Sequence, residues 1–361
     1  MKLSVISFTK NGRRLGEKLA ARLADKDFKE TEEIVLYTKC SAAAEQDGAH
    51  PVIPVEESIG EWAGKQMREN NALLFIGACG IAVRAVAPHI TDKLHDSPVL
   101  VMDERGDYII PVLSGHMGGA NEIALKIAER IGAVPVITTA TDLNGMFSVD
   151  LFAKKNGLSI LNKEGIAKVS SKVLAGKQIT VSVETGHISE NCRVPEGIQI
   201  VPYPPVQAVD VLITKKESGS PAALVLKPKE YVIGMGCKKG KEPERVEAFI
   251  EQTLNAAGIL KEQCMALASI EQKKDEQAFL QWSRKYRFPF YTYTAEQLQE
   301  VKGGFHGSAF VKDSVGVDNV CERAALKACG EKGELICEKH AQDGMTIAVA
   351  KREWSVAFDE E

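Results

Sequence analysis

The sequence lacks several features that would assign it quickly to a class of protein. Its eight cysteines are spread along 361 residues without one CxxC pair, so their spacing indicates neither a zinc site nor a small disulfide scaffold. No hydrophobic run approaches membrane-spanning length. The first residues, MKLSVISFTKNG, have no apolar signal-peptide core. We therefore expect a cytoplasmic protein with reduced thiols.

The sequence also lacks an excess of positive charge. With 45 lysines and arginines against 49 acidic residues, its net charge is -4, which removes a general electrostatic attraction to nucleic acid or to an anionic membrane. We expect neither as a partner, and a polyanionic ligand would need a local site. Hydrophobic residues make up 44% of the chain, as in ordinary globular proteins of two or three domains. The sequence does not indicate the oligomeric state.

Strand-like and helical patterns alternate in the first part of the chain. The expected strands are 2–8, 33–38, 72–78 and 134–139, and the expected helices are 13–24, 58–69 and 121–131. The run from Pro98 to Leu113 predicts two strands joined by a turn at 105–107. This alternation predicts a doubly wound, mainly parallel sheet with helices on both faces, in an α/β domain over residues 1–142.

The rest of the chain divides at a proline- and lysine-containing segment, LKPKE, which we interpret as a linker. Residues 143–226 predict a small middle α/β unit, and residues 227–361 a C-terminal α/β domain. In the latter, the expected strands are 231–236, 264–270, 288–293, 333–340 and 345–352, with a further segment at 308–316. The expected helices are 242–257, 275–286, 295–301 and 317–328.

The segment FIGACGIAVRAVAP runs from a strand into a helix through Gly77 and Gly80, with Arg84 one turn later. Glycines at such a junction let backbone N–H groups approach an anion, and an arginine can bind a carboxylate through two hydrogen bonds. This pattern favours a site for carboxylates or phosphates. The alternative is a tight turn with Arg84 on the surface.

A second strand-to-helix loop, SGHMGGAN, contains our first catalytic candidate, His116. Imidazole acts as an acid or a base near neutral pH. The loop also supplies candidate binding and catalytic groups: Ser114, Gly115, Gly118, Gly119 and Asn121. The alternative is a histidine that only forms hydrogen bonds within its loop.

The segment TTATD ends the next expected strand with threonine hydroxyls and a carboxylate, among them Thr138, Thr139 and Asp142. Ligands of doubly wound sheets bind beyond the carboxyl ends of the strands. We therefore expect this segment to share one crevice with the Arg84 loop and the His116 loop. Alternatively, Asp142 caps the next helix and the threonines follow strand propensity.

The C-terminal domain begins with IGMGCKKG, which places Gly234 and Gly236 in a GxGxxxG spacing. A lone match of this kind is a weak indication of dinucleotide binding. Lys238 and Lys239 are point charges better suited to several carboxylates. Cys237 is either a nucleophile beside these lysines or, as we favour, a small buried thiol.

The segment GVDNVCERAAL places Glu322 in the first turn of a helix, where the helix dipole favours a carboxylate. Glu322 is therefore either a capping residue or part of a binding site. From its position in the helix alone, we favour capping.

These motifs resemble, in the same order, the CbiG family of cobalt-precorrin-5A hydrolases from anaerobic cobalamin biosynthesis. The first part contributes GIAVRAVAP, DKLHDSPVLVMDERG, VLSGHMGGAN and PVITTATD, and the last part GMGCKKG, LASIEQKKDE and GVDNVCERAAL. The resemblance covers nearly the whole chain and is weakest between residues 151 and 229. It is far more specific than any single glycine motif.

The resemblance implies that water opens the ring A acetate lactone of cobalt-precorrin-5A and that the methylated bridge carbon leaves as acetaldehyde, giving cobalt-precorrin-5B. Such a reaction needs a base and a stabilised oxyanion. We hypothesise that His116 is this base and that Asp142 orients it or the water. The oxyanion would be stabilised by the amides of Gly118 and Gly119 and by Asn121.

The substrate's many carboxylates would bind at the two α/β domains, one on either side of the macrocycle. The implied binding residues are Gly77, Gly80, Arg84, Ser114, Gly115, Gly118, Gly119, Thr138, Thr139, Gly234, Gly236, Lys238, Lys239 and Glu322. No cofactor and no protein-bound metal are expected, because the cobalt arrives with the substrate. The alternative from another class is a corrinoid-intermediate binding or carrier protein without chemistry, and a nicotinamide-dependent oxidoreductase ranks last.

Overall fold

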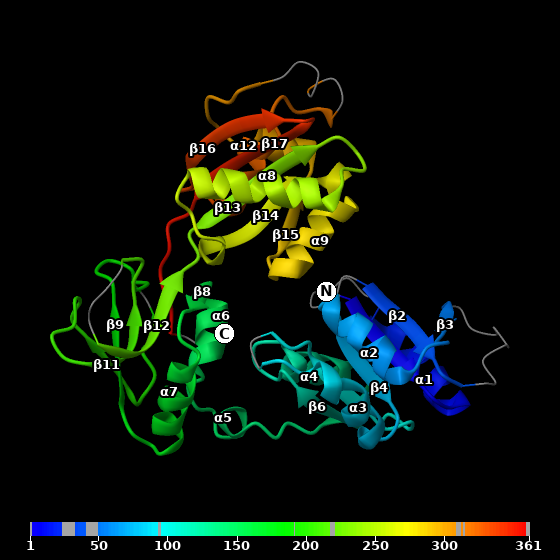
Figure 1. Cartoon of the computed structure of the whole chain (residues 1–361). Coiled ribbons are helices and arrows are strands. Elements are labelled where there is room, and N and C mark those ends of the chain that lie inside the picture. The colour runs from blue at the N-terminus through cyan, green and yellow to red at the C-terminus, as the bar shows by residue number, and fades with distance from the viewer. Residues whose placement is uncertain are drawn as a thin grey trace. The chain divides into compact units, whose positions relative to one another are not determined.

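The computed structural model describes residues 2–23, 33–40, 50–92, 95–190, 192–216, 221–307, 312 and 315–358, with the side chain of Asp142 excepted. The chain forms two compact units, Met1–Met146 and Phe147–Glu361. Figure 1 shows the helices and strands of each unit. No helix among these residues is both long and apolar enough to cross a membrane.

The first unit is built on a seven-stranded sheet with the order β3-β2-β1-β4-β5-β6-β7. The strands are β1 (Lys2–Ser7), β2 (Glu33–Thr38), β3 (Val52–Pro54), β4 (Ala72–Ile76), β5 (Val99–Met102), β6 (Tyr108–Leu113) and β7 (Val134–Pro135). Neighbours from β3 to β5 are parallel, β5 and β6 form an antiparallel hairpin, and β7 is parallel to β6. Both the mainly parallel sheet and the predicted pair of strands in 98–113 are confirmed.

Helices cover both faces of this sheet, as predicted. They are α1 (Lys10–Leu23), α2 (Ile59–Arg68), α3 (Cys79–Val86), α4 (Ala120–Ile131) and the short α5 (Ala140–Leu143), with a 3-10 turn, η1, at Ala87–His89. The helices α1 and α4 pack on one face, where Leu15, Leu19 and Ile123 are buried. The helices α2 and α3 pack on the other face through Trp62 and Ala82. The spacing of these apolar side chains is that of amphipathic helices.

The strand β7 is much shorter than the expected strand 134–139. The N–H of Val136 still donates to the Ile109 carbonyl at 2.8 Å, and the next ladder bond would need an N–H from Pro111, which proline lacks. The chain leaves the sheet there, so Thr138 and Thr139 lie in the segment that leads to α5.

The second unit contains two five-stranded sheets, with the orders β10-β9-β11-β12-β8 and β15-β14-β13-β17-β16. The middle sheet consists of β8 (Leu158–Ile160), β9 (Ile179–Val183), β10 (Ile198–Val201), β11 (Val209–Ile213) and β12 (Ala222–Pro228), with helices α6 (Val149–Lys155) and α7 (Glu164–Leu174). Its strands are parallel except β8. This is the small α/β unit expected in the middle of the chain.

The C-terminal sheet also follows the predicted alternation. Its strands are β13 (Tyr231–Cys237), β14 (Cys264–Ile270), β15 (Phe290–Tyr293), β16 (Glu334–Gln342) and β17 (Met345–Lys351), and its helices are α8 (Pro243–Ala256), α9 (Gln277–Tyr286), α10 (Ala295–Gln299) and α12 (Cys321–Cys329), with 3-10 turns η2 (Lys261–Gln263) and η3 (Glu271–Lys273). The strands β13 to β15 are parallel, and the hairpin β16–β17 adds to β13 antiparallel. The predicted segment 308–316 lies largely outside the described residues.

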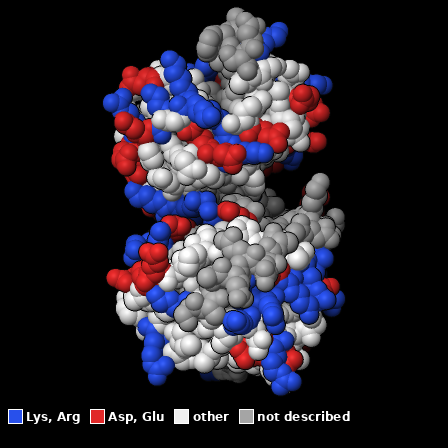
Figure 2. Space-filling view, turned by 90° about the vertical axis from the view of Figure 1, so that its right-hand side faces the viewer, with Lys and Arg blue, Asp and Glu red and all other residues white. Residues whose placement is uncertain are grey.

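Charged side chains of both signs are mixed on the side of the molecule drawn in Figure 2. On that side, groups of lysine and arginine side chains are interrupted by aspartate and glutamate side chains and do not form one continuous basic face. An anionic ligand would therefore be bound by local groups rather than by a broad field.

Candidate functional site

The loop between β6 and α4 is compact because its residues adopt conformations that few side chains allow. Ser114 has a φ of +57° and Gly119, the N-cap of α4, a φ of +86°. A Cβ atom on Gly118 would lie 2.5 Å from the Cβ of Ser114, so only glycine fits there. The Ser114 hydroxyl donates to the Asp96 carbonyl at 2.9 Å. This turn places the polar groups of the loop against the start of α4.

The backbone hydrogen bonds within this loop determine which of its N–H groups could still donate to a ligand. The N–H of Gly119 donates to the His116 carbonyl and the N–H of Asn121 donates to the Gly115 carbonyl, each at 3.1 Å. For the N–H of Gly118, the described residues supply no acceptor. Of the two glycine amides expected to stabilise an oxyanion, only that of Gly118 is therefore available in this conformation.

The structure brings His116 and Asn121 together with the threonines that precede α5. The Nε2 atom of His116 lies 3.3 Å from the Thr141 hydroxyl, and Nδ2 of Asn121 donates to the Thr139 hydroxyl at 3.1 Å. The sequence had pointed to Thr138 and Thr139, yet Thr138 is exposed and Thr141 is the partner of the histidine. We refer to His116, Asn121, Thr139 and Thr141 as the His116 cluster.

Asp142 follows Thr141 directly in α5. Its side chain lies outside the described part of the structure. Its predicted role, to orient the imidazole or the attacking water, therefore stays a prediction.

The expectation that the Arg84 loop shares a crevice with the His116 loop is wrong. The β5–β6 hairpin reverses the chain, so Leu113 at the end of β6 pairs with Val99 at the start of β5. The Gly77 loop follows the carboxyl end of β4, which is parallel to β5. The two loops lie at opposite edges of the sheet, roughly 13 Å apart along the strands.

The Arg84 loop instead has the geometry of a tight turn with a surface arginine. Nη1 of Arg84 donates to the Gly80 carbonyl at 3.0 Å, in an exposed position. A Cβ atom on Gly77 would lie 3.0 Å from the ring of Phe8. Both observations agree with the structural alternative considered for this loop.

The glycines of the C-terminal GxGxxxG segment serve packing rather than a phosphate loop. Gly234 lies within β13, and a Cβ atom there would collide with the Cys321 carbonyl in α12. A Cβ atom on Gly236 would lie 2.8 Å from the Thr346 hydroxyl oxygen. The helix α8 begins only at Pro243, so the close turn of a dinucleotide fingerprint is not formed. Lys238, which follows this strand, is exposed, as is Lys239.

Glu322 connects three segments of the C-terminal unit. Its carboxylate has no exposed surface and accepts hydrogen bonds from the amides of Lys339 at 2.8 Å and His306 at 3.1 Å, and from the Asn319 side chain. Burial works to raise the pKa of Glu322, but the hydrogen bonds from Lys339 and His306 and the charge interaction with His306 outweigh it and hold the pKa below its ordinary value. Its contacts are those of a residue that positions its neighbours rather than one that faces a ligand.

Cys237 does not have the properties of an activated nucleophile. Burial raises the pKa of its thiol to about 11, although Lys273 opposes the shift, so the thiol is protonated near neutral pH. This agrees with the small-thiol interpretation. Within the described residues, no three His, Cys, Asp or Glu side chains are grouped as a metal site would require.

Three family models match successive parts of the chain. They are "Cobalamin synthesis G N-terminal" at residues 61–142, "Cobalamin biosynthesis central region" at residues 147–228 and "Cobalamin synthesis G C-terminus" at residues 231–350. A solved structure described as a cobalamin biosynthesis protein G homologue from Sulfolobus solfataricus is 24% identical, with a TM-score of 0.40, over 98% of this chain and 97% of the other.

Two curated relatives match over most of their length. The cobalt-precorrin-5A hydrolase of Salmonella typhimurium is 33% identical over 305 residues, which is 82% of this chain and 86% of the relative. That of Priestia megaterium is 33% identical over 293 residues, 77% of this chain and 78% of the relative. The chain belongs to the cobalt-precorrin-5A hydrolase family, CbiG, which confirms the resemblance drawn from the motifs.

Proposed function

We propose that this chain hydrolyses cobalt-precorrin-5A, opening the ring A acetate lactone and releasing the methylated bridge carbon as acetaldehyde to give cobalt-precorrin-5B. The observation that supports a site for this chemistry is the His116 cluster, which combines an imidazole with hydroxyls and shares its loop with the available N–H of Gly118 before α4. All eight cysteines are free thiols, in keeping with a cytoplasmic enzyme. The cobalt is part of the substrate, and no further cofactor is needed.

In the first stage, His116 acts as a general base. The imidazole takes a proton from a water molecule whose oxygen forms a bond to the lactone carbonyl carbon. The carbonyl oxygen becomes an oxyanion, which the N–H of Gly118 and the positive end of α4 stabilise. When the tetrahedral intermediate collapses, the bond to the ring oxygen breaks and His116 returns the proton to that oxygen.

In the second stage, the same imidazole removes the proton of the hydroxyl that the first stage leaves on the bridge carbon. The oxygen lone pair forms the carbonyl of acetaldehyde, the carbon–carbon bond to the macrocycle breaks, and the macrocycle accepts the electron pair and a proton. Thr141, 3.3 Å from Nε2 of His116, holds the ring in one orientation through both stages. One base thus serves two proton transfers.

The function is tested by anaerobic incubation of the purified chain with enzymatically prepared cobalt-precorrin-5A. Acetaldehyde is followed with a coupled alcohol dehydrogenase and the tetrapyrrole by mass. We expect one acetaldehyde for each substrate consumed. A corrinoid that binds stoichiometrically and stays unchanged would contradict the hydrolase and favour the carrier protein.

A further inference from the structure

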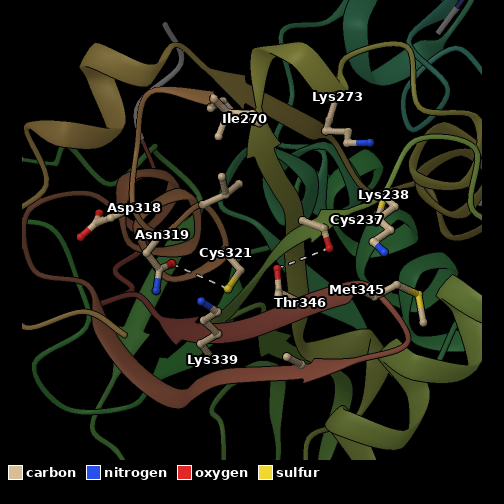
Figure 3. A pocket seen from close by; sticks show the side chains of 15 residues that line it. Cys237, Lys238, Ile270, Lys273, Asp318, Asn319, Cys321, Lys339, Met345 and Thr346 are labelled. Atoms are coloured by element: carbon tan, nitrogen blue, oxygen red, sulfur yellow. Dashed lines mark hydrogen bonds between the residues drawn. The ribbon is translucent and has the colours of Figure 1, made fainter. Parts of the chain in front are cut away.

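A cavity of about 360 Å³ opens in the C-terminal part of the second unit. Figure 3 shows it beyond the ends of the strands β13 and β14, beside the start of α12 and the hairpin β16–β17. The side chains of Ile270, Val315, Val320 and Met345 give it an apolar lining. In size and character it is comparable to pockets that bind small organic molecules.

The topology of the C-terminal sheet places this cavity where α/β sheets commonly bind ligands. From β13, the chain adds β14 and β15 on one side and then returns to add β16 and β17 on the other. The sheet therefore has a switch point beside β13, and the crevice outside the carboxyl ends of the strands at such a point is the usual ligand site. Gly236 and Cys237 line the cavity at that end of β13.

Two ammonium groups at the cavity have no carboxylate partner among the described residues. Lys273 is paired with Glu276, with Nζ 2.8 Å from Oε2, and the lining carboxylate of Asp318 is paired with Arg323. Among the described residues, Lys238 forms no such ion pair. The cavity wall therefore carries two ammonium groups that form no ion pair with a carboxylate of the described residues.

Lys339 reaches the cavity from the strand β16. Its Nζ atom donates to the neutral carbonyl of His306 at 2.9 Å, and among the described residues no carboxylate lies within ion-pair distance of it. Figure 3 shows Lys339 on one side of the cavity and Lys238 and Lys273 on another. An apolar space between separated ammonium groups suits a compact apolar body that carries at least two anionic groups.

We propose that this cavity binds one edge of a tetrapyrrole, with pyrrole atoms against the apolar lining and carboxylate side chains on Lys238 and Lys339. The volume suits a part of a macrocycle better than a whole one. The identity of the natural ligand rests on the proposed function, whereas the cavity and its charges do not. Glu322 positions the side of the cavity that contains Lys339, because its carboxylate accepts a hydrogen bond from the backbone amide of Lys339.

The inference is tested with the full-length chain and uroporphyrin III, a fluorescent tetrapyrrole with acetate and propionate groups, by an anisotropy titration. We expect Lys238→Met and Lys339→Met each to raise Kd about tenfold, because each removes one charged hydrogen bond. Ala341→Trp, which adds bulk to the lining, should also weaken binding. Lys332→Met is the matched control, since Lys332 pairs with Glu353 on the exposed surface away from the cavity.

A tetracationic porphyrin separates charge recognition from general adsorption of a flat ring, and we expect it not to compete. The inference is overturned if uroporphyrin III does not bind, if the cationic porphyrin binds as well, or if both lysine variants bind like the wild type. Failure of the proposed function has a different signature. In that case no acetaldehyde forms, while the two lysine variants still weaken uroporphyrin binding.

Discussion

The His116 cluster and the C-terminal cavity differ in the chemical groups that they contain. The cluster uses an imidazole, neutral hydroxyls and an amide, held by a strained loop at a sheet edge. The cavity uses ammonium groups over apolar side chains, at the switch point of another sheet. The first arrangement suits proton transfer and the second suits holding an anionic ring. The difference suggests that chemistry and binding are assigned to different units of the chain.

The largest expected effect comes from removing the imidazole. His116→Ala should lower kcat by about 10²- to 10⁴-fold, the usual contribution of a general base, and leave the Kd of uroporphyrin III unchanged. Acetaldehyde release measures the first quantity and anisotropy the second. His50→Ala, a histidine of the same unit outside the cluster, is the control. If His116→Ala turns over substrate as fast as the wild type, His116 is not the general base and the His116 cluster does not carry the chemistry.

A second prediction concerns Gly234, which the sequence suggested as a binding residue. Gly234→Ala should lower the free energy of unfolding by about 1–3 kcal/mol or more, because the added methyl group meets the Cys321 carbonyl. Gly304→Ala is the control, since a Cβ atom there meets nothing within 4 Å. Chemical denaturation measures both. A stable Gly234→Ala variant with weakened ligand binding would restore the binding role.

Removing the threonine that holds the imidazole should have a smaller effect. Thr141→Val keeps the shape of the side chain but removes the hydroxyl near Nε2 of His116, so we expect kcat to fall about tenfold, the cost of one hydrogen bond. Thr253→Val, which loses only a bond to its own helix, should keep full activity. Equal rates for the two variants would show that Thr141 does not orient the base.

The smallest effect is expected in the pH dependence of stability. Because the pKa of Glu322 is lowered in the folded state from 4.5, its ionised form stabilises the fold above that pH, and this stability is lost as the pH falls through the folded value. Glu322→Gln should therefore be less stable than the wild type at neutral pH and lose less stability as the pH is lowered below 4.5. Chemical denaturation of both proteins at a series of pH values measures this difference. If the free energy of unfolding falls equally with pH in the wild type and in Glu322→Gln, the prediction is contradicted.

Local signals in the sequence predicted much of the fold, whereas the pairing of distant groups could not be read from it. The amphipathic helices and the two strands in 98–113 were predicted from periodicity and turn residues. The same hairpin reverses β6 and so separates Arg84 from His116, a consequence that depends on which strands pair.

The candidate sites show the same limit. The glycine loop identified His116, because small residues before a helix form a local pattern. The Thr141 hydroxyl, by contrast, lies within hydrogen-bond distance of His116 only because β7 ends early and α5 follows. Lys339 stands in a strand with no motif around it, and the full burial of Glu322 depends on segments distant in sequence. Residues of these kinds are found only once the fold is known.

The most direct test of the division between chemistry and binding is a comparison of kcat and KM for His116→Ala and Lys339→Met in the same acetaldehyde assay. Loss of the base should lower kcat with little change in KM. Loss of the ammonium group should raise KM about tenfold with kcat near that of the wild type, provided that KM reports substrate binding. If both variants lower kcat alone, or both raise KM alone, the division is contradicted.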